Sequence, residues 1–85
     1  MNKQKRASAH SMAPMECRKA YATYSRAAVQ SEVEHQWAQA ADYWNKARSF
    51  AHGSEDLEHC ARRSAFCNKQ AAREAHYIPK EVRHG

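Results

Sequence analysis

Apolar and small residues recur in the middle of the chain at the spacing of an α-helix. Between Glu16 and Glu34 they fall three, four, seven, ten, eleven and fourteen residues after Cys17, which places them on one side of a helix. Pro14 suits the first turn of such a helix, because the N–H group that proline lacks has no partner there. The sequence therefore predicts a first amphipathic helix with a buried stripe of Cys17, Ala20, Tyr21, Tyr24, Ala27, Ala28 and Ser31.

A second stripe with the same spacing begins after a break near His35 and Gln36. We expect Gly53 to end this second helix as its C′ residue, with His52 beside the negative end of the helix dipole. In outline the segment resembles the second helix of a tetratricopeptide hairpin, although no second copy of the unit occurs in the chain. The stripe consists of Trp37, Ala40, Ala41, Trp44, Ala47 and Ala51.

A third stripe follows the glycine. Ser54 is expected to cap this helix, and Glu55 and Asp56 suit its positively polarised first turn. The pattern fades near Ala75, and Pro79 prevents the helix from continuing. The buried positions predicted for this helix are Leu57, Cys60, Ala61, Ser64, Cys67, Asn68 and Ala71.

Two short connections between three helices define the expected fold. Short connections make consecutive helices antiparallel neighbours. The sequence therefore predicts an all-α, three-helix domain, in which a tetratricopeptide-like antiparallel hairpin is packed by the third helix. This domain is expected to span residues 14–76, with a flexible basic arm at 1–13 and a frayed tail at 77–85.

The expected core is thin, because Leu, Ile, Val and Phe together supply seven of the 85 residues. Alanine supplies 17; it forms helices readily, which favours a folded helical core over a disordered basic chain. Because the core is so small, the sequence is also compatible with a homodimer. The hairpin is expected to pack around Tyr21, Tyr24, Trp37, Ala41 and Trp44. The third helix is expected to cover it with Leu57, Cys60 and Cys67.

The formal net charge of +5 is unevenly distributed. Residues 1–31 hold six basic and one acidic residue, residues 32–58 two and six, and residues 59–85 six and two. Basic ends around an acidic middle permit contact with a nucleic acid but also suit a basic protein partner. No stretch approaches the ~20 apolar residues of a membrane span, and three cysteines do not form a disulfide framework. We therefore expect a cytoplasmic protein without a membrane partner.

A set of residues on all three predicted helices, within about residues 20–68, matches a family pattern: Ala28, Glu34, His35-Gln36-Trp37, Ala40-Ala41, Trp44, Ala47, Ala61-Arg62 and Ala65-Phe66-Cys67. Through these residues the chain resembles the ANR family, small bacterial proteins named as negative regulators of AraC/XylS-type transcription activators. The family joins a first helix with Ala-Ala and many Glu residues to a Tyr-x-x-Ala-Ala-x-x-Trp-x-x-Ala helix. A third helix with an Arg-x-x-Phe-Cys-like ending follows.

The resemblance implies that the protein binds an AraC/XylS-type activator directly and blocks its dimerisation or its binding to DNA. A small helical domain can do so by covering an apolar helix face of the activator. Tyr43 and Phe66 lie off the stripes and are expected to be exposed, whereas core packing is favoured for Trp44. The positions predicted to contact a partner, or to support such a contact, are Tyr43, Trp44, Leu57 and Phe66.

A second hypothesis is direct binding of nucleic acid through the third helix and the N-terminal arm. Lys3, Lys5 and Arg6 in the arm could contact phosphates. No helix-turn-helix signature accompanies them. On the third helix the predicted contacts are Arg62, Arg63, Lys69 and Arg73.

The residues give no support for catalysis, a metal or a cofactor. His59, Cys60 and Cys67 lack the paired C-x2–4-C spacing of zinc sites, and the two cysteines share the apolar stripe. Glu32 and Glu34 lie at a helix end, where carboxylates are usually solvated charges. We therefore expect a protein that is not an enzyme and has no cofactor.

Overall fold

The computed structural model describes residues 13–76 of the 85-residue chain. Within this part the protein consists of three α-helices and no strands, which confirms the all-α, three-helix prediction. The predicted basic arm at 1–13, apart from Ala13, and the predicted tail at 77–85 lie outside the described residues. The helices are α1 (Pro14–Val33), α2 (Trp37–Arg48) and α3 (Ser54–His76).

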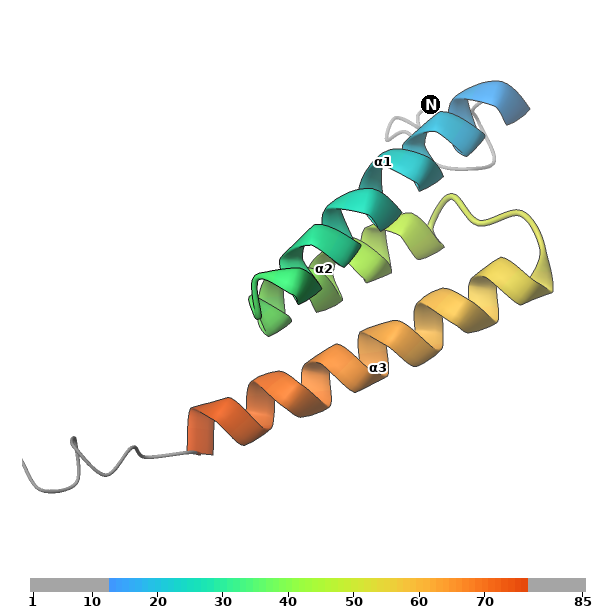
Figure 1. Ribbon diagram of the computed structural model, residues 1–85. Helices are drawn as coiled ribbons and strands as arrows, with labels where there is room; N and C mark the ends of the chain where they lie inside the picture. The colour runs from blue at the N-terminus through green and yellow to red at the C-terminus, as the bar shows by residue number, and fades with distance from the viewer. Residues whose placement is uncertain (1–12, 77–85) are drawn as a thin grey trace, which may run out of the picture.

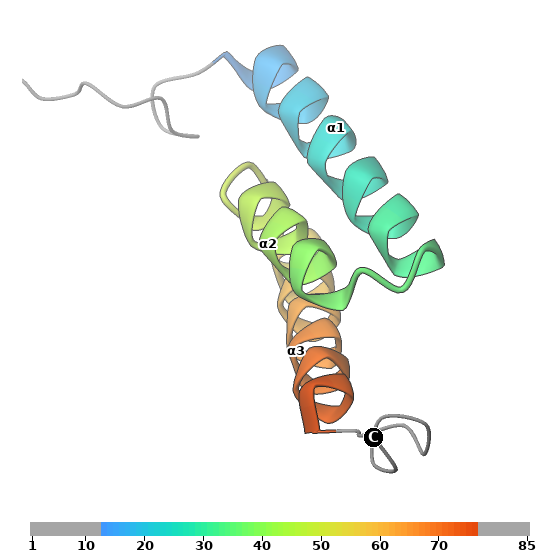
Figure 2. The same cartoon turned by 90° about the vertical axis from the view of Figure 1, so that its left-hand side faces the viewer.

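The helices follow an up-down-up path, so α1 and α2 form an antiparallel hairpin and α3 returns along α2 (Figure 1). In the second view α2 lies between the other two helices (Figure 2). Both α1 and α3 therefore pack against α2. This is the predicted hairpin packed by a third helix. Because α2 has 12 residues and its neighbours have 20 and 23, both outer helices extend past it.

The turn between α1 and α2 is a left-handed helix cap. His35 has φ 58°, a conformation that glycine adopts more readily than histidine. Its N–H donates to the Glu32 carbonyl at 3.0 Å, and the N–H of Gln36 donates to the Ser31 carbonyl at 2.8 Å. Together these bonds close the last turn of α1 in a Schellman motif. The break predicted near His35 and Gln36 is confirmed.

The connection between α2 and α3 differs from the prediction. The second helix was expected to reach Ala51, but α2 ends at Arg48, and the next three residues form tight turns instead. Gly53 is not the C′ residue of α2, since none of the described glycines has a positive φ. The Gly53 carbonyl accepts a hydrogen bond from the Leu57 N–H at 3.0 Å, so Gly53 is the N-cap residue of α3. Ser54, which was expected to be the N-cap, is the first residue of the helix.

The core is built mainly from alanine, cysteine and one tryptophan. Trp44 is 3% exposed, and alanines on α1 and α2 let the helix backbones approach it closely. Tyr21, Tyr24 and Trp37 pack around this centre, as predicted. The buried cluster consists of Ala28, Ala40, Ala41, Trp44, Ala47, Cys60 and Cys67.

Two members of the third stripe, Asn68 and Leu57, are exposed, so the prediction is wrong for both. Asn68 follows the buried Cys67 by one residue, about 100° around the helix, and so leaves the buried side. Leu57 is the larger side chain. The sequence placed it over the hairpin, yet it is 42% exposed. It lies in the first turn of α3, beyond the end of α2, so the helix that should cover it has already ended (Figure 1). The prediction of a buried Leu57 is therefore wrong.

Candidate functional site

The side of α3 turned away from the core carries an aromatic ring among basic side chains. Its residues recur at helical spacing and lie opposite the buried positions Cys60, Ser64 and Cys67. Part of this surface is an open hollow of about 310 Å³. We call it the α3 face and define it as Arg62, Ala65, Phe66, Lys69 and Arg73.

Phe66, at the edge of the α3 face beside Trp37, is exposed but held in place. It is 41% exposed. The Trp37 ring meets it edge-on, with centroids 5.8 Å apart and planes at 80°, and the Arg63 guanidinium lies 4.5 Å from its centroid. Trp37 is itself fixed, because its indole N–H donates to Glu74 at 3.0 Å. A large apolar ring is thus presented to solvent in an orientation fixed from two sides.

Arg63 belongs to a polar cluster that joins all three helices around Glu32. Its Nη2 and Nε donate to the two Glu32 carboxylate oxygens at 2.6 and 3.2 Å. The Trp44 indole N–H donates to the same carboxylate at 2.7 Å, and the Cys67 thiol does so at 3.3 Å. We call these four residues the Glu32 cluster. The Glu32 side chain is 17% exposed, so the expectation of a solvated charge at a helix end is wrong.

The sequence held a signal for this burial. Glu32 follows the buried Ala28 by four residues, so it lies on the same side of α1 as the apolar stripe. From the sequence the helix was expected to end near Glu34, and Glu32 was therefore given the solvated position of a helix end. The partner Arg63 lies 31 residues away, and no local pattern connects the two.

The ionisation of the Glu32 cluster follows from its contacts. Burial raises the pKa of the Glu32 carboxyl, but hydrogen bonds from Arg63, Trp44 and Cys67 outweigh it, so this pKa lies below its usual value. Burial and the adjacent Glu32 raise the pKa of Cys67 to about 11. Burial likewise raises the pKa of Cys60. Cys60 and Cys67 are therefore neutral thiols rather than nucleophiles.

The predicted partner-binding residues fall in different environments. Trp44 lies in the core, so it can only support a surface. Tyr43 was expected to be exposed, but it is half-buried, with its ring centroid 6.4 Å from that of Tyr24. Leu57 and Phe66 are exposed, and Phe66 lies on the α3 face. The structure therefore does not unite the four residues in one surface.

The predicted nucleic-acid contacts divide in the same way. Arg62, Lys69 and Arg73 share the α3 face, but Arg63 points toward Glu32 and is part of the internal structure. Arg62 also lies 3.7 Å from Glu58, an exposed i,i+4 pair that partly neutralises it. The basic surface is thus weaker than the sequence suggests.

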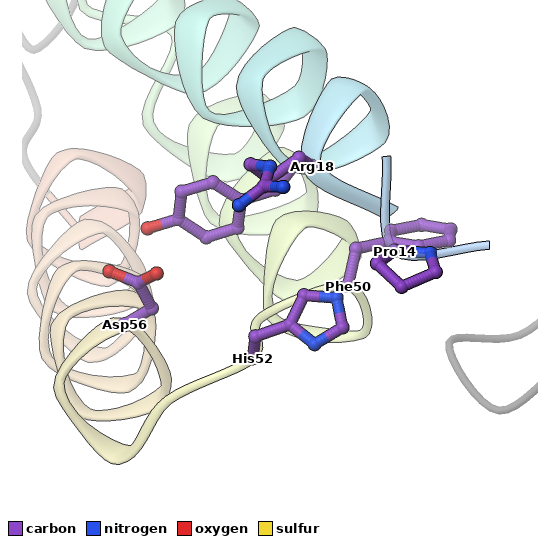
Figure 3. Close-up of a pocket in the computed structure, with 6 residues that line it drawn as sticks. Pro14, Arg18, Phe50, His52 and Asp56 are labelled. Carbon is purple, nitrogen blue, oxygen red and sulfur yellow. The ribbon is translucent and has the colours of Figure 1, made fainter. Parts of the chain in front are cut away.

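A cleft that the sequence did not indicate lies between the first turns of α1 and α3 (Figure 3). It has a volume of about 410 Å³. The Tyr21 hydroxyl in its wall accepts a hydrogen bond from the Cys60 thiol at 3.8 Å. Burial and the contact with Cys60 raise the pKa of Tyr21 to about 12, so the hydroxyl stays protonated. The lining residues are Pro14, Arg18, Tyr21, Phe50, His52 and Asp56.

Residues 13–76 form a small all-α, three-helix domain. No protein-family model, curated protein or solved structure matches the chain. Within residues 13–76, no group of three His, Cys, Asp or Glu side chains is placed to hold a metal ion. None of the three described helices has the length and apolar character needed to cross a membrane.

Proposed function

We propose that the protein is a small cytoplasmic regulator that acts by binding another protein through the α3 face. The observation that supports this is the fixed, exposed ring of Phe66. Binding energy at protein interfaces concentrates in a few large side chains, and an anchor that is already ordered loses little conformational entropy on binding. Phe66, held by Trp37 and Arg63, has both properties.

The partner class that we propose is an AraC/XylS-type transcription activator, on the basis of the sequence resemblance. The α3 face would cover an apolar helix face of the activator and so prevent its dimerisation or its contact with DNA. The surrounding basic residues Arg62, Lys69 and Arg73 favour a partner surface with acidic side chains.

A protein partner agrees better with the surface than a nucleic acid does. Phosphate binding relies on several cations that can reach the backbone. Arg63 is occupied by Glu32 and Arg62 lies beside Glu58, which leaves Lys69 and Arg73 as the principal cations of the α3 face. The exposed phenylalanine on the same face favours an apolar contact instead.

The test is a binding titration of the purified full-length protein against purified AraC/XylS-type activators from the same genome. Phe66→Ala should weaken binding about 30-fold, the effect of losing an interface anchor. Val29→Ala is the matched control, since Val29 is an exposed apolar residue of α1 and should change affinity less than twofold. Circular dichroism of both variants should show unchanged helicity.

The same titration distinguishes the two hypotheses. A labelled DNA duplex that carries the activator's site should bind the activator but not this protein. Duplex binding that weakens steeply with salt and with Lys69→Glu would favour the nucleic-acid hypothesis. Binding of activators that is unaffected by Phe66→Ala would contradict the assignment of the α3 face.

A further inference from the structure

The cleft between α1 and α3 exists because α2 is short. The helix ends at Arg48, so the first turns of α1 and α3 extend past it and are bridged only by the connecting segment. Phe50 in that segment folds back on α1, with its ring centroid 5.9 Å from that of Tyr24 and the planes at 14°. The space left between the two overhanging turns is the cleft of about 410 Å³.

The walls of the cleft combine apolar surface with one charge of each sign. Pro14, Tyr21 and Phe50 supply apolar and aromatic area, Arg18 and Asp56 supply the charges, and His52 adds an imidazole ring. The close-up shows Arg18 on α1 and Asp56 on the facing turn of α3, with Pro14 beside Phe50 (Figure 3). A mostly apolar cleft of this size with a few polar groups is typical of small-ligand sites.

The two charged groups each select a feature of the ligand. The Arg18 guanidinium offers N–H donors in a fork that matches a carboxylate, whereas the Asp56 carboxylate accepts hydrogen bonds from an ammonium group. A ligand with only a carboxylate would be repelled by Asp56, and a ligand with only an ammonium group would be repelled by Arg18. A ligand that carries both groups satisfies both walls.

From this geometry we infer that the cleft binds a large apolar α-amino acid in its zwitterionic form. The α-carboxylate lies against Arg18, the α-ammonium group against Asp56, and the side chain on the surface formed by Phe50, Pro14 and Tyr21. The cleft lies on the core side of α3 and the α3 face lies opposite. The inference is therefore independent of the proposed protein interface.

The test is an NMR titration of the 15N-labelled full-length protein with L-phenylalanine. An open site and a ligand of this size predict saturable shifts with a millimolar Kd at the amides of Tyr21, Phe50 and Asp56. N-acetyl-L-phenylalanine lacks the ammonium group and L-phenylalaninamide lacks the carboxylate. Each should bind at least about tenfold more weakly, the effect of losing one charged hydrogen bond. L-alanine, which lacks the large side chain, should give no saturable shifts.

Matched variants assign the two charges. Arg18→Gln and Asp56→Asn should each weaken L-phenylalanine binding about tenfold or more. The controls Arg26→Gln on α1 and Glu55→Gln in the first turn of α3 carry the same changes outside the cleft and should bind normally.

Three results would overturn the inference. The first is the absence of saturable shifts with L-phenylalanine. The second is equal binding of either blocked derivative, which would indicate a peptide terminus or a simple acid as the ligand. The third is normal binding by Arg18→Gln or Asp56→Asn. The ligand series uses the unaltered protein, so it decides the question even if a variant loses helicity.

Discussion

Removal of the Glu32 carboxylate should destabilise the protein more than any other change to a charged residue in the described part of the chain. The carboxylate lies on α1 and accepts hydrogen bonds from Trp44 on α2 and from Arg63 and Cys67 on α3. Glu32→Ala removes the acceptor and its charge. Glu32→Gln removes the charge but keeps one acceptor oxygen at nearly the position of a Glu32 carboxylate oxygen.

The two changes differ in size for a physical reason. In Glu32→Ala the indole N–H of the buried Trp44 loses its acceptor, which costs about 1–3 kcal/mol. Arg63, whose side chain is 34% exposed, regains water, so loss of the ion pair adds only about 1 kcal/mol. A total of about 3 kcal/mol is large for a domain of ~60 residues, whose whole stability is about 3–9 kcal/mol. Glu32→Gln still accepts from Trp44 and should cost about 1 kcal/mol.

The assay is thermal and urea unfolding followed by circular dichroism. Glu32→Gln should lower the melting temperature by about 4–8 °C, and Glu32→Ala, with three times the loss of stability, by about 12–24 °C. The control Glu34→Gln changes an exposed carboxylate on the same turn, bonded at 2.8 Å to Gln30, and should change stability by less than about 0.5 kcal/mol. A Glu32→Ala protein that melts within about 2 °C of the unaltered protein would refute the role of the Glu32 cluster.

Three further predictions concern stability. His35→Gly should raise the free energy of unfolding, measured in urea, by about 1 kcal/mol, because a φ of 58° strains histidine but not glycine. An unchanged urea midpoint would mean that this gain is cancelled by loss of the stacking between His35 and Trp37, whose ring centroids are 5.5 Å apart. Trp44→Ala should abolish cooperative unfolding, since truncation of a buried tryptophan costs about 3–5 kcal/mol, and a cooperative melt would contradict its core role. The pKa of Glu32 is lower in the folded state, so its contribution to stability is present above the usual value of 4.5 and is lost as the pH falls through the folded value. Urea midpoints should therefore fall on acidification, and Glu32→Gln should fall less; parallel curves would contradict this.

The sequence by itself determined the three helices and their buried faces. The spacing of small and aromatic residues defined stripes whose members, such as Ala28, Trp44 and Cys67, are buried in the structure. Helical periodicity is a local property, because each residue's side of the helix follows from its place in the chain. The break at His35 was also local, since one left-handed residue and two backbone hydrogen bonds produce it.

Only the tertiary structure decided what happens where helices of unequal length meet. The early end of α2 at Arg48 exposes Leu57 and creates the cleft lined by Arg18 and Asp56, and no stripe encodes either result. Glu32 pairs with Arg63, 31 residues away. Because of this pairing, Glu32 links the three helices instead of lying in solvent at a helix end. Arg63, which was predicted to contact phosphates, points toward Glu32 instead. Long-range partners depend on how the helices pack against one another, and the local pattern of residues does not contain that information.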